Sequence, residues 1–126
     1  MLGGKLYKER AMRAIIAALL LVVTTTGSGA QVVGLGGRSC AEFAKDYLES
    51  SDIAEPLYFT YAQGYMSALN MLFVTLKRPG YNLVVWPSDR QKAHIRKFCS
   101  QNPDAEYVFA VQNLLEALPR TSRNSN

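Results

Sequence analysis

The stretch HIRKFCSQNP, residues 94–103, decides how the rest of the sequence is interpreted. A basic helical segment runs into Cys99, and a polar turn with Asn102 and Pro103 follows. The chain holds one other cysteine, Cys40. Cys99 could act as a nucleophile, as a metal ligand or as one half of a disulfide bond, and each role predicts a different kind of protein.

The first thirty residues have the features of a secretory signal peptide. A positively charged start precedes the apolar run AIIAALLLVV (14–23), and Ser28 and Ala30 supply the small residues of a cleavage site. The apolar run is too short for a comfortable membrane span. We expect cleavage after Ala30, a periplasmic or secreted location, and no stable membrane insertion of the remaining chain.

In an exported chain, an even number of cysteines indicates a disulfide bond. His94 is the only histidine, and its spacing from Cys99 places the two about 140° apart around a helix, so they do not form a nucleophile–base pair. One histidine and two distant cysteines are too few for a zinc site. We therefore expect a Cys40–Cys99 disulfide, no metal, no cofactor and no enzymatic activity.

The basic character of the full chain comes mainly from the expected signal peptide. The net charge of the 126 residues is +4. Residues 31–126 contain ten basic and nine acidic residues, which gives the mature chain a net charge of +1. This near balance does not favour binding to nucleic acids.

The apolar residues of the mature chain recur with helical periodicity and predict a small all-α domain of four helices. We expect the helical domain at 39–119, a flexible arm at 31–38 and a disordered tail at 120–126. The predicted start signals of the four helices are, in order, Ser39 with Glu42, Pro56, Ser88 with Gln91, and Asn102 with Pro103.

The expected second helix, 56–76, carries no charged residue and has one strongly apolar face. That face comprises Tyr58, Tyr61, Tyr65, Leu69, Leu72 and Leu76. It packs in the core or, in part, meets a partner, because a tyrosine ring is apolar while its hydroxyl can stay in water. In the last helix, Phe109 faces away from the predicted buried stripe. The candidate partner-binding residues are therefore Tyr58, Tyr61, Tyr65 and Phe109.

Two short motifs resemble a known family. SCAEF (39–43) opens the first expected helix, and FCSQNP (98–103) closes the third. Together they resemble the HdeA/HdeB acid-stress chaperones, which are small periplasmic all-helical proteins with one disulfide. The resemblance implies a Cys40–Cys99 disulfide, a core position for Phe43 and the binding of client proteins in acid.

A second resemblance implies a different kind of partner. YAQGYMSALN (61–70), followed by a cysteine, NP and a helix that ends in LLEALP (114–119), is similar to Tai-type immunity proteins. Those are periplasmic helical proteins that neutralise a secreted effector. This resemblance implies one specific protein partner in place of many clients.

An acid-activated function has a physical basis in the composition. Around pH 3 most of the nine mature carboxylates would be protonated while the ten Lys and Arg residues stay charged, so the net charge would rise from +1 towards roughly +10. Self-repulsion could then separate subunits or loosen helices. We expect a non-enzymatic protein-binding protein whose partner is a client or an effector. An HdeA-like chaperone is the first hypothesis, an immunity-type protein or another periplasmic interaction protein is the alternative, and a homodimer stays open.

Overall fold

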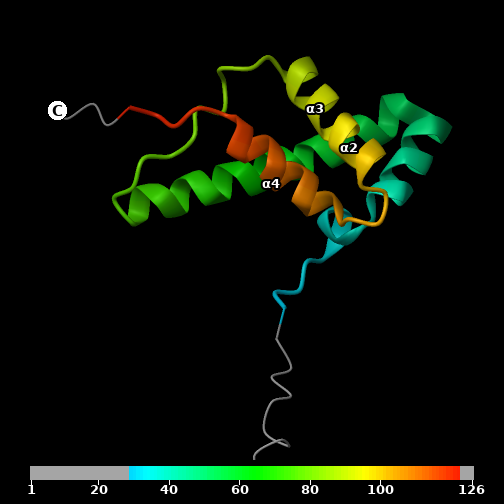
Figure 1. Ribbon diagram of the computed structural model, residues 1–126, viewed down its shortest axis with the longest axis horizontal. Helices are drawn as coiled ribbons and strands as arrows, with labels where there is room; N and C mark the ends of the chain where they lie inside the picture. Colours follow the sequence, from blue (N-terminus) through cyan, green and yellow to red (C-terminus); the bar gives the residue numbers. More distant parts are fainter. Residues whose placement is uncertain (1–28, 123–126) are drawn as a thin grey trace, which may run out of the picture. The chain divides into compact units, whose positions relative to one another are not determined.

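The computed structural model describes residues 29–122. Residues 1–28 of the expected signal peptide and residues 123–126 of the expected tail lie outside the described part. The described residues from 31 onward belong to one compact unit. Within the described residues this unit is all-helical, with a short 3-10 helix η1 (Gly34–Gly37) and three α-helices, α2 (Cys40–Thr75), α3 (Ser88–Gln101) and α4 (Tyr107–Ala117) (Figure 1). The predicted all-α fold class is confirmed.

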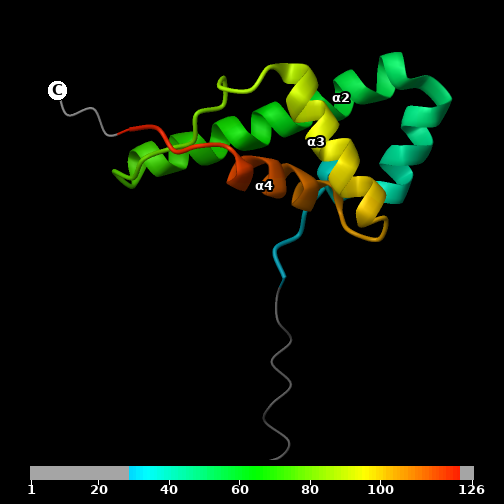
Figure 2. The same ribbon diagram turned by 45° about the horizontal axis from the view of Figure 1, so that its top comes forward.

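Helix α2 spans the first two helices expected from the sequence. At Ser50 the backbone leaves the helical conformation (φ −159°, ψ 74°), and the two parts of α2 run in different directions from there (Figures 1 and 2). Ser50, Ser51 and Asp52 are of residue types that are less favourable in helix interiors than at helix ends and turns. The helix start predicted at Pro56 is wrong, because Pro56 lies inside the second part of α2.

The capping box predicted at the start of α2 is confirmed. The backbone N–H of Glu42 donates to Ser39 Oγ (3.1 Å), and the backbone N–H of Ser39 donates to Glu42 Oε2 (2.8 Å). The exchange satisfies two donors that the first turn of a helix cannot satisfy by itself.

The start signals predicted for α3 and α4 are wrong. Ser88 and Gln91 form no capping box, because Gln91 is buried and its Nε2 donates to the carbonyls of Leu83 (2.9 Å) and Trp86 (2.8 Å). Asn102 ends α3, where its Nδ2 donates to the carbonyl of Phe98 (2.9 Å). In both cases the side-chain amide bonds a carbonyl of the preceding segment.

The predicted Cys40–Cys99 disulfide is confirmed, and it joins the first turn of α2 to the last turn of α3. Beside it, the rings of Phe43, Tyr58 and Tyr107 contact one another with centroid separations of 4.9–5.1 Å. We call these three residues the aromatic triad. Because they come from both parts of α2 and from α4, the triad fixes the angle at which the chain bends.

The packed unit extends beyond the expected helical domain at its N-terminal end. Leu35 of η1 packs against the core and Gly36 is buried. The backbone N–H of Tyr107 donates to the carbonyl of Arg38 (2.7 Å). Residues 34–38 of the expected arm are thus attached to α4 in this structure.

At the other end, the chain after α4 runs beside the loop that follows α2. The backbone N–H of Asn82 donates to the carbonyl of Pro119 (2.8 Å), and that of Thr121 donates to the carbonyl of Gly80 (2.9 Å). The Arg120 guanidinium lies 3.7 Å from the centre of the Tyr81 ring. These contacts hold residues 119–121 against the loop.

Replacing both cysteines, Cys40→Ser with Cys99→Ser, should lower the free energy of unfolding by roughly 4 kcal/mol, because the disulfide closes a loop of 59 residues in the unfolded chain. Denaturant unfolding of the oxidised parent and the double variant measures the difference. A difference below 1 kcal/mol would show that the disulfide adds little to the stability of the fold.

The variants Gly36→Ala and Gly64→Ala should have opposite effects. A Cβ at residue 36 would overlap the hydroxyl of Tyr61, whereas a Cβ at residue 64 meets open space. We expect Gly36→Ala to cost about 1–3 kcal/mol, and Gly64→Ala to gain about 0.5–1 kcal/mol because alanine favours a helix. Thermal unfolding measures both, and a stabilised Gly36→Ala variant would contradict the packing of η1.

Candidate functional site

The structure places the three candidate tyrosines at different depths. Tyr58 has 2% of its surface exposed and belongs to the aromatic triad, so in this fold it is a core residue and does not reach a partner. Burial, together with the hydrogen bond to Asp46, raises the pKa of the Tyr58 hydroxyl above its usual value. The helical periodicity predicted which face of the helix carries Tyr58, but it did not predict which other elements would cover that face.

Tyr61 and Tyr65 are half-buried at the edge between α2 and α4. Their rings stack at 6.3 Å, and Gln112 Nε2 donates to the Tyr65 hydroxyl (2.7 Å). Burial raises the pKa of the Tyr61 hydroxyl. Phe109 is 50% exposed, on the outward side of α4 that the sequence predicted, and it lies one turn before Gln112. Tyr61, Tyr65, Phe109 and Gln112 form a partly apolar surface that we call the tyrosine edge.

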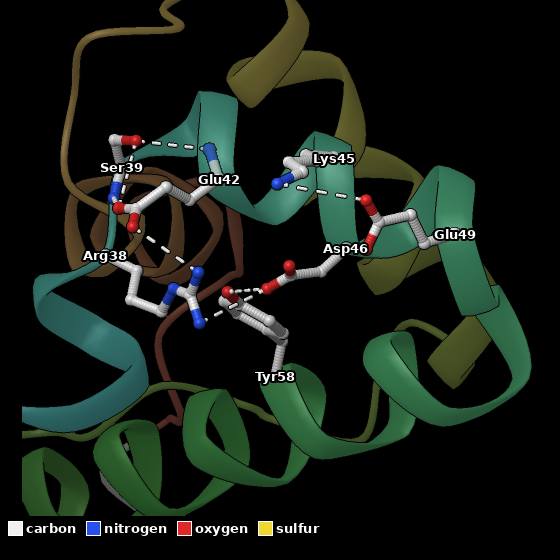
Figure 3. Close-up of polar contacts among 7 residues, drawn as sticks. All are labelled: Arg38, Ser39, Glu42, Lys45, Asp46, Glu49 and Tyr58. Atoms are coloured by element: carbon white, nitrogen blue, oxygen red, sulfur yellow. Dashed lines mark hydrogen bonds and ion pairs between the residues drawn. The ribbon is translucent and has the colours of Figure 1, made fainter.

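A polar cluster that the sequence did not predict spans the bend of α2 (Figure 3). Tyr58 donates from its hydroxyl to Asp46 Oδ2 (2.8 Å), which joins the second part of α2 to the first. The Arg38 guanidinium lies 3.5 Å from the same carboxylate and 3.4 Å from that of Glu42. We call Arg38, Glu42, Asp46 and Tyr58 the Arg38 cluster.

The Arg38 cluster is incompletely satisfied. Arg38 Nε is buried and has no hydrogen-bond partner among the described residues. Both of its ion-pair contacts exceed the usual 2.7–2.9 Å of a charge-assisted hydrogen bond. The hydrogen bonds from Ser39 lower the pKa of the Glu42 carboxyl below its ordinary value of 4.5. The cluster therefore depends on carboxylates that stay charged at neutral pH.

A second carboxylate contact fixes the bend from the other side. Glu55, in the second part of α2, forms an ion pair with Arg96 of α3, and both side chains are partly buried. The guanidinium of Arg96 also lies 5.6 Å from the centre of the Tyr47 ring. Glu55 and Arg96 are 41 positions apart, so no periodicity in the sequence indicated their contact.

An apolar groove lies over the disulfide, between the first part of α2 and the end of α3. Two adjoining hollows of about 220 and 590 Å³ share Ala44, Leu48, Cys99 and Ser100 in their walls. Leu48 is 85% exposed at the rim. We call this hollow region the disulfide groove. It has the size and lining to accept an apolar side chain of a partner.

Neither a metal site nor a membrane span is present in the described part of the chain. No group of three or more His, Cys, Asp or Glu residues within 29–122 is arranged to hold a metal ion. No helix in the same range has both the length and the hydropathy to cross a bilayer. No protein-family model, curated protein or solved structure matches the chain. The geometry of the protein itself must therefore carry the functional argument.

Glu42 should make the stability of the protein pH-dependent. Because its pKa is lowered in the folded state, its contribution is complete at pH 7 and is lost as the pH falls from 4.5 through the folded pKa. Glu42→Gln should therefore be less stable than the parent at pH 7, and the difference in stability should shrink as the pH falls below 4.5. Denaturant unfolding at several pH values measures this.

Glu116→Gln is the matched control for that experiment, because the Glu116 side chain is exposed and forms no hydrogen bond or ion pair with other side chains in 29–122. Its difference from the parent should stay small at every pH. A gap for Glu42→Gln that does not change with pH would contradict the charged capping box.

Proposed function

We propose that this chain is an exported, non-enzymatic protein-binding protein that gains client-binding capacity in acid. The observation that carries the proposal is the chemistry at the bend of α2. Asp46 and Glu55 link the two parts of the bent helix to their neighbours, and each carboxylate forms an ion pair with an arginine. Exposed apolar residues surround the same bend, namely Leu48, Ile53 and Leu57.

Export is part of the proposal. We propose that residues 1–30 are a signal peptide and that the mature protein occupies the periplasm or the medium. A disulfide between the two cysteines supports this, since such bonds persist in oxidising compartments. The resemblance to the HdeA/HdeB chaperones supports the same location and the same class of function.

Acid would act through the contacts at the bend. The loss of carboxylate charge in acid raises the net positive charge of the chain and weakens the ion pairs that Arg38 and Arg96 form at the bend. The two parts of α2 then separate at Ser50 and move as independent helices, which corresponds to the four-helix organisation expected from the sequence. The opening exposes the aromatic triad beside the disulfide groove. The disulfide meanwhile keeps the two helices that border the groove together.

One observation favours a second candidate function. The disulfide groove is already open in the structure, so a single partner could bind without any opening of the bend. This is what an immunity-type protein, specific for one effector, requires. That protein would bind tightly at pH 7 and would give no general protection of clients.

The chaperone proposal predicts protection of aggregating client proteins at pH 2–3 and none at pH 7. Client light scattering is recorded with the parent and with Asp46→Asn/Glu55→Gln, which mimics the protonated carboxylates. The double variant should begin to protect at a higher pH than the parent, because the bend has already lost its charged contacts. Leu48→Ser should weaken protection in acid.

The double variant Asp104→Asn/Glu106→Gln is the control, because it removes two exposed carboxylates without touching the bend. Its protection profile should follow that of the parent. Absence of protection at every pH, together with one tight partner recovered at pH 7, would replace the chaperone proposal by the immunity-type function. A parent that stays closed from pH 7 to pH 2, with no binding of a hydrophobic dye, would refute acid opening.

A further inference from the structure

The charges of this chain are strongly segregated along its length. Between Pro56 and Pro103 there are six basic residues, and Asp89 is the one acidic residue. Asp89 forms an ion pair with Lys92 (3.8 Å). The remaining parts of residues 31–122 carry a net negative charge. A surface built from 56–103 is therefore cationic, although the mature chain is nearly neutral.

Within this cationic segment, one surface is also apolar and exposed. Met71 and Val74 near the end of α2 are 71% and 72% exposed, and Val84 in the following loop is 89% exposed. At 100° per residue, Met71 and Val74 lie on the same side of α2 as Gln63 and Ser67. Gln63 and Ser67 line a hollow together with Val84 and Trp86, so α2 and the loop form one continuous surface.

Hydrogen bonds on both sides of Val84 hold this residue in an exposed position. The Asn70 side chain pairs with both the N–H and the carbonyl of Tyr81 (2.9 and 2.8 Å), and the buried Gln91 side chain binds the carbonyls of Leu83 and Trp86. Because the loop is tied on both sides of Val84, the exposure of this valine is a fixed feature of the fold.

Cations flank this surface at both ends. Lys77 and Arg78 are exposed directly after α2, and Arg90 is stacked 3.9 Å over the Trp86 ring at the start of α3. In both views the last turns of α2 lie away from α3 and α4 (Figures 1 and 2), so these helices do not cover this end. We call the set the basic–apolar face, comprising Met71, Val74, Val84, Trp86, Lys77, Arg78 and Arg90.

We propose that the basic–apolar face binds peripherally to an anionic lipid surface. Exposed aliphatic side chains, a tryptophan and flanking cations without unpaired carboxylates are the combination that suits the boundary between acyl chains and phosphate headgroups. The charge of the face is complementary to anionic phospholipids, and this proposal is independent of the chaperone function.

The shape of the face favours lipid over an acidic protein. Leu72 and Leu76 are also exposed, and they lie on the opposite side of α2 from Met71 and Val74. A protein partner with one rigid groove covers a single side of a helix, whereas a lipid interface can surround its end. The experiment must therefore distinguish binding to an acidic protein from binding to lipid.

The test uses the full chain with vesicles of phosphatidylcholine alone and with vesicles that also contain phosphatidylglycerol. Trp86 is the only tryptophan of the chain, so its emission reports on this face and not on residues 1–30. We expect a blue shift of the emission with anionic vesicles only. Lys77→Gln/Arg78→Gln should weaken binding roughly tenfold to thirtyfold, and Met71→Ser/Val84→Ser should remove the blue shift.

The control variant Lys45→Gln/Leu48→Ser also removes one exposed cation and one exposed apolar residue, but in the first part of α2. It should bind the vesicles like the parent, and circular dichroism should show that all variants fold. Vesicle binding that leaves the Trp86 emission unchanged, or that is equal for all variants, would overturn the proposal. Binding to an acidic protein without vesicle binding would replace lipid by a protein partner.

Discussion

The Cys40–Cys99 disulfide ties the first turn of α2 to the last turn of α3, and the rest of the structure is arranged around this tie. A helical unit of this size buries only a modest core and is marginal on hydrophobic burial alone. Next to the disulfide, Phe43 contacts Tyr58 and Tyr107, so the bond and the aromatic triad stabilise the same junction. The bend of α2 and the disulfide groove both follow from this junction, because the first part of α2 must reach α3 while the second part packs on α4.

Charge divides the molecule into two regions with different chemistry. The carboxylates that matter for the fold, those of Asp46 and Glu55, lie on either side of the bend and contact arginines from neighbouring segments. The exposed cations Lys77, Arg78 and Arg90 instead lie in the segment that carries the exposed aliphatic residues Met71, Val74 and Val84. Surface ion pairs contribute little to stability individually. Their position at a single bend makes them matter, since both ion pairs connect the bent helix to a neighbouring segment.

The sequence predicted some features of the fold reliably. The capping box of Ser39 and Glu42, the all-α class and the outward position of Phe109 depend on residues close together in the chain, where periodicity and local hydrogen bonding decide the outcome. The start signals at Ser88 and Asn102 failed because a side-chain amide has several possible backbone partners nearby. A glutamine or asparagine side chain bonds whichever backbone group the fold brings near, and here that group was a carbonyl of the preceding segment.

The sequence by itself determined the two cysteines, the helical periodicity, the apolar face of residues 56–76 and the segregation of charge. Each of these depends only on residue type and on spacing along the chain. Only the tertiary structure decided that Tyr58 is buried while Tyr61 and Tyr65 are not, that Leu48 borders a groove, and that Arg38 reaches Asp46. Those outcomes depend on the angle at Ser50 and on which helix covers which face. Such relations join residues far apart in the chain, and no local pattern encodes them.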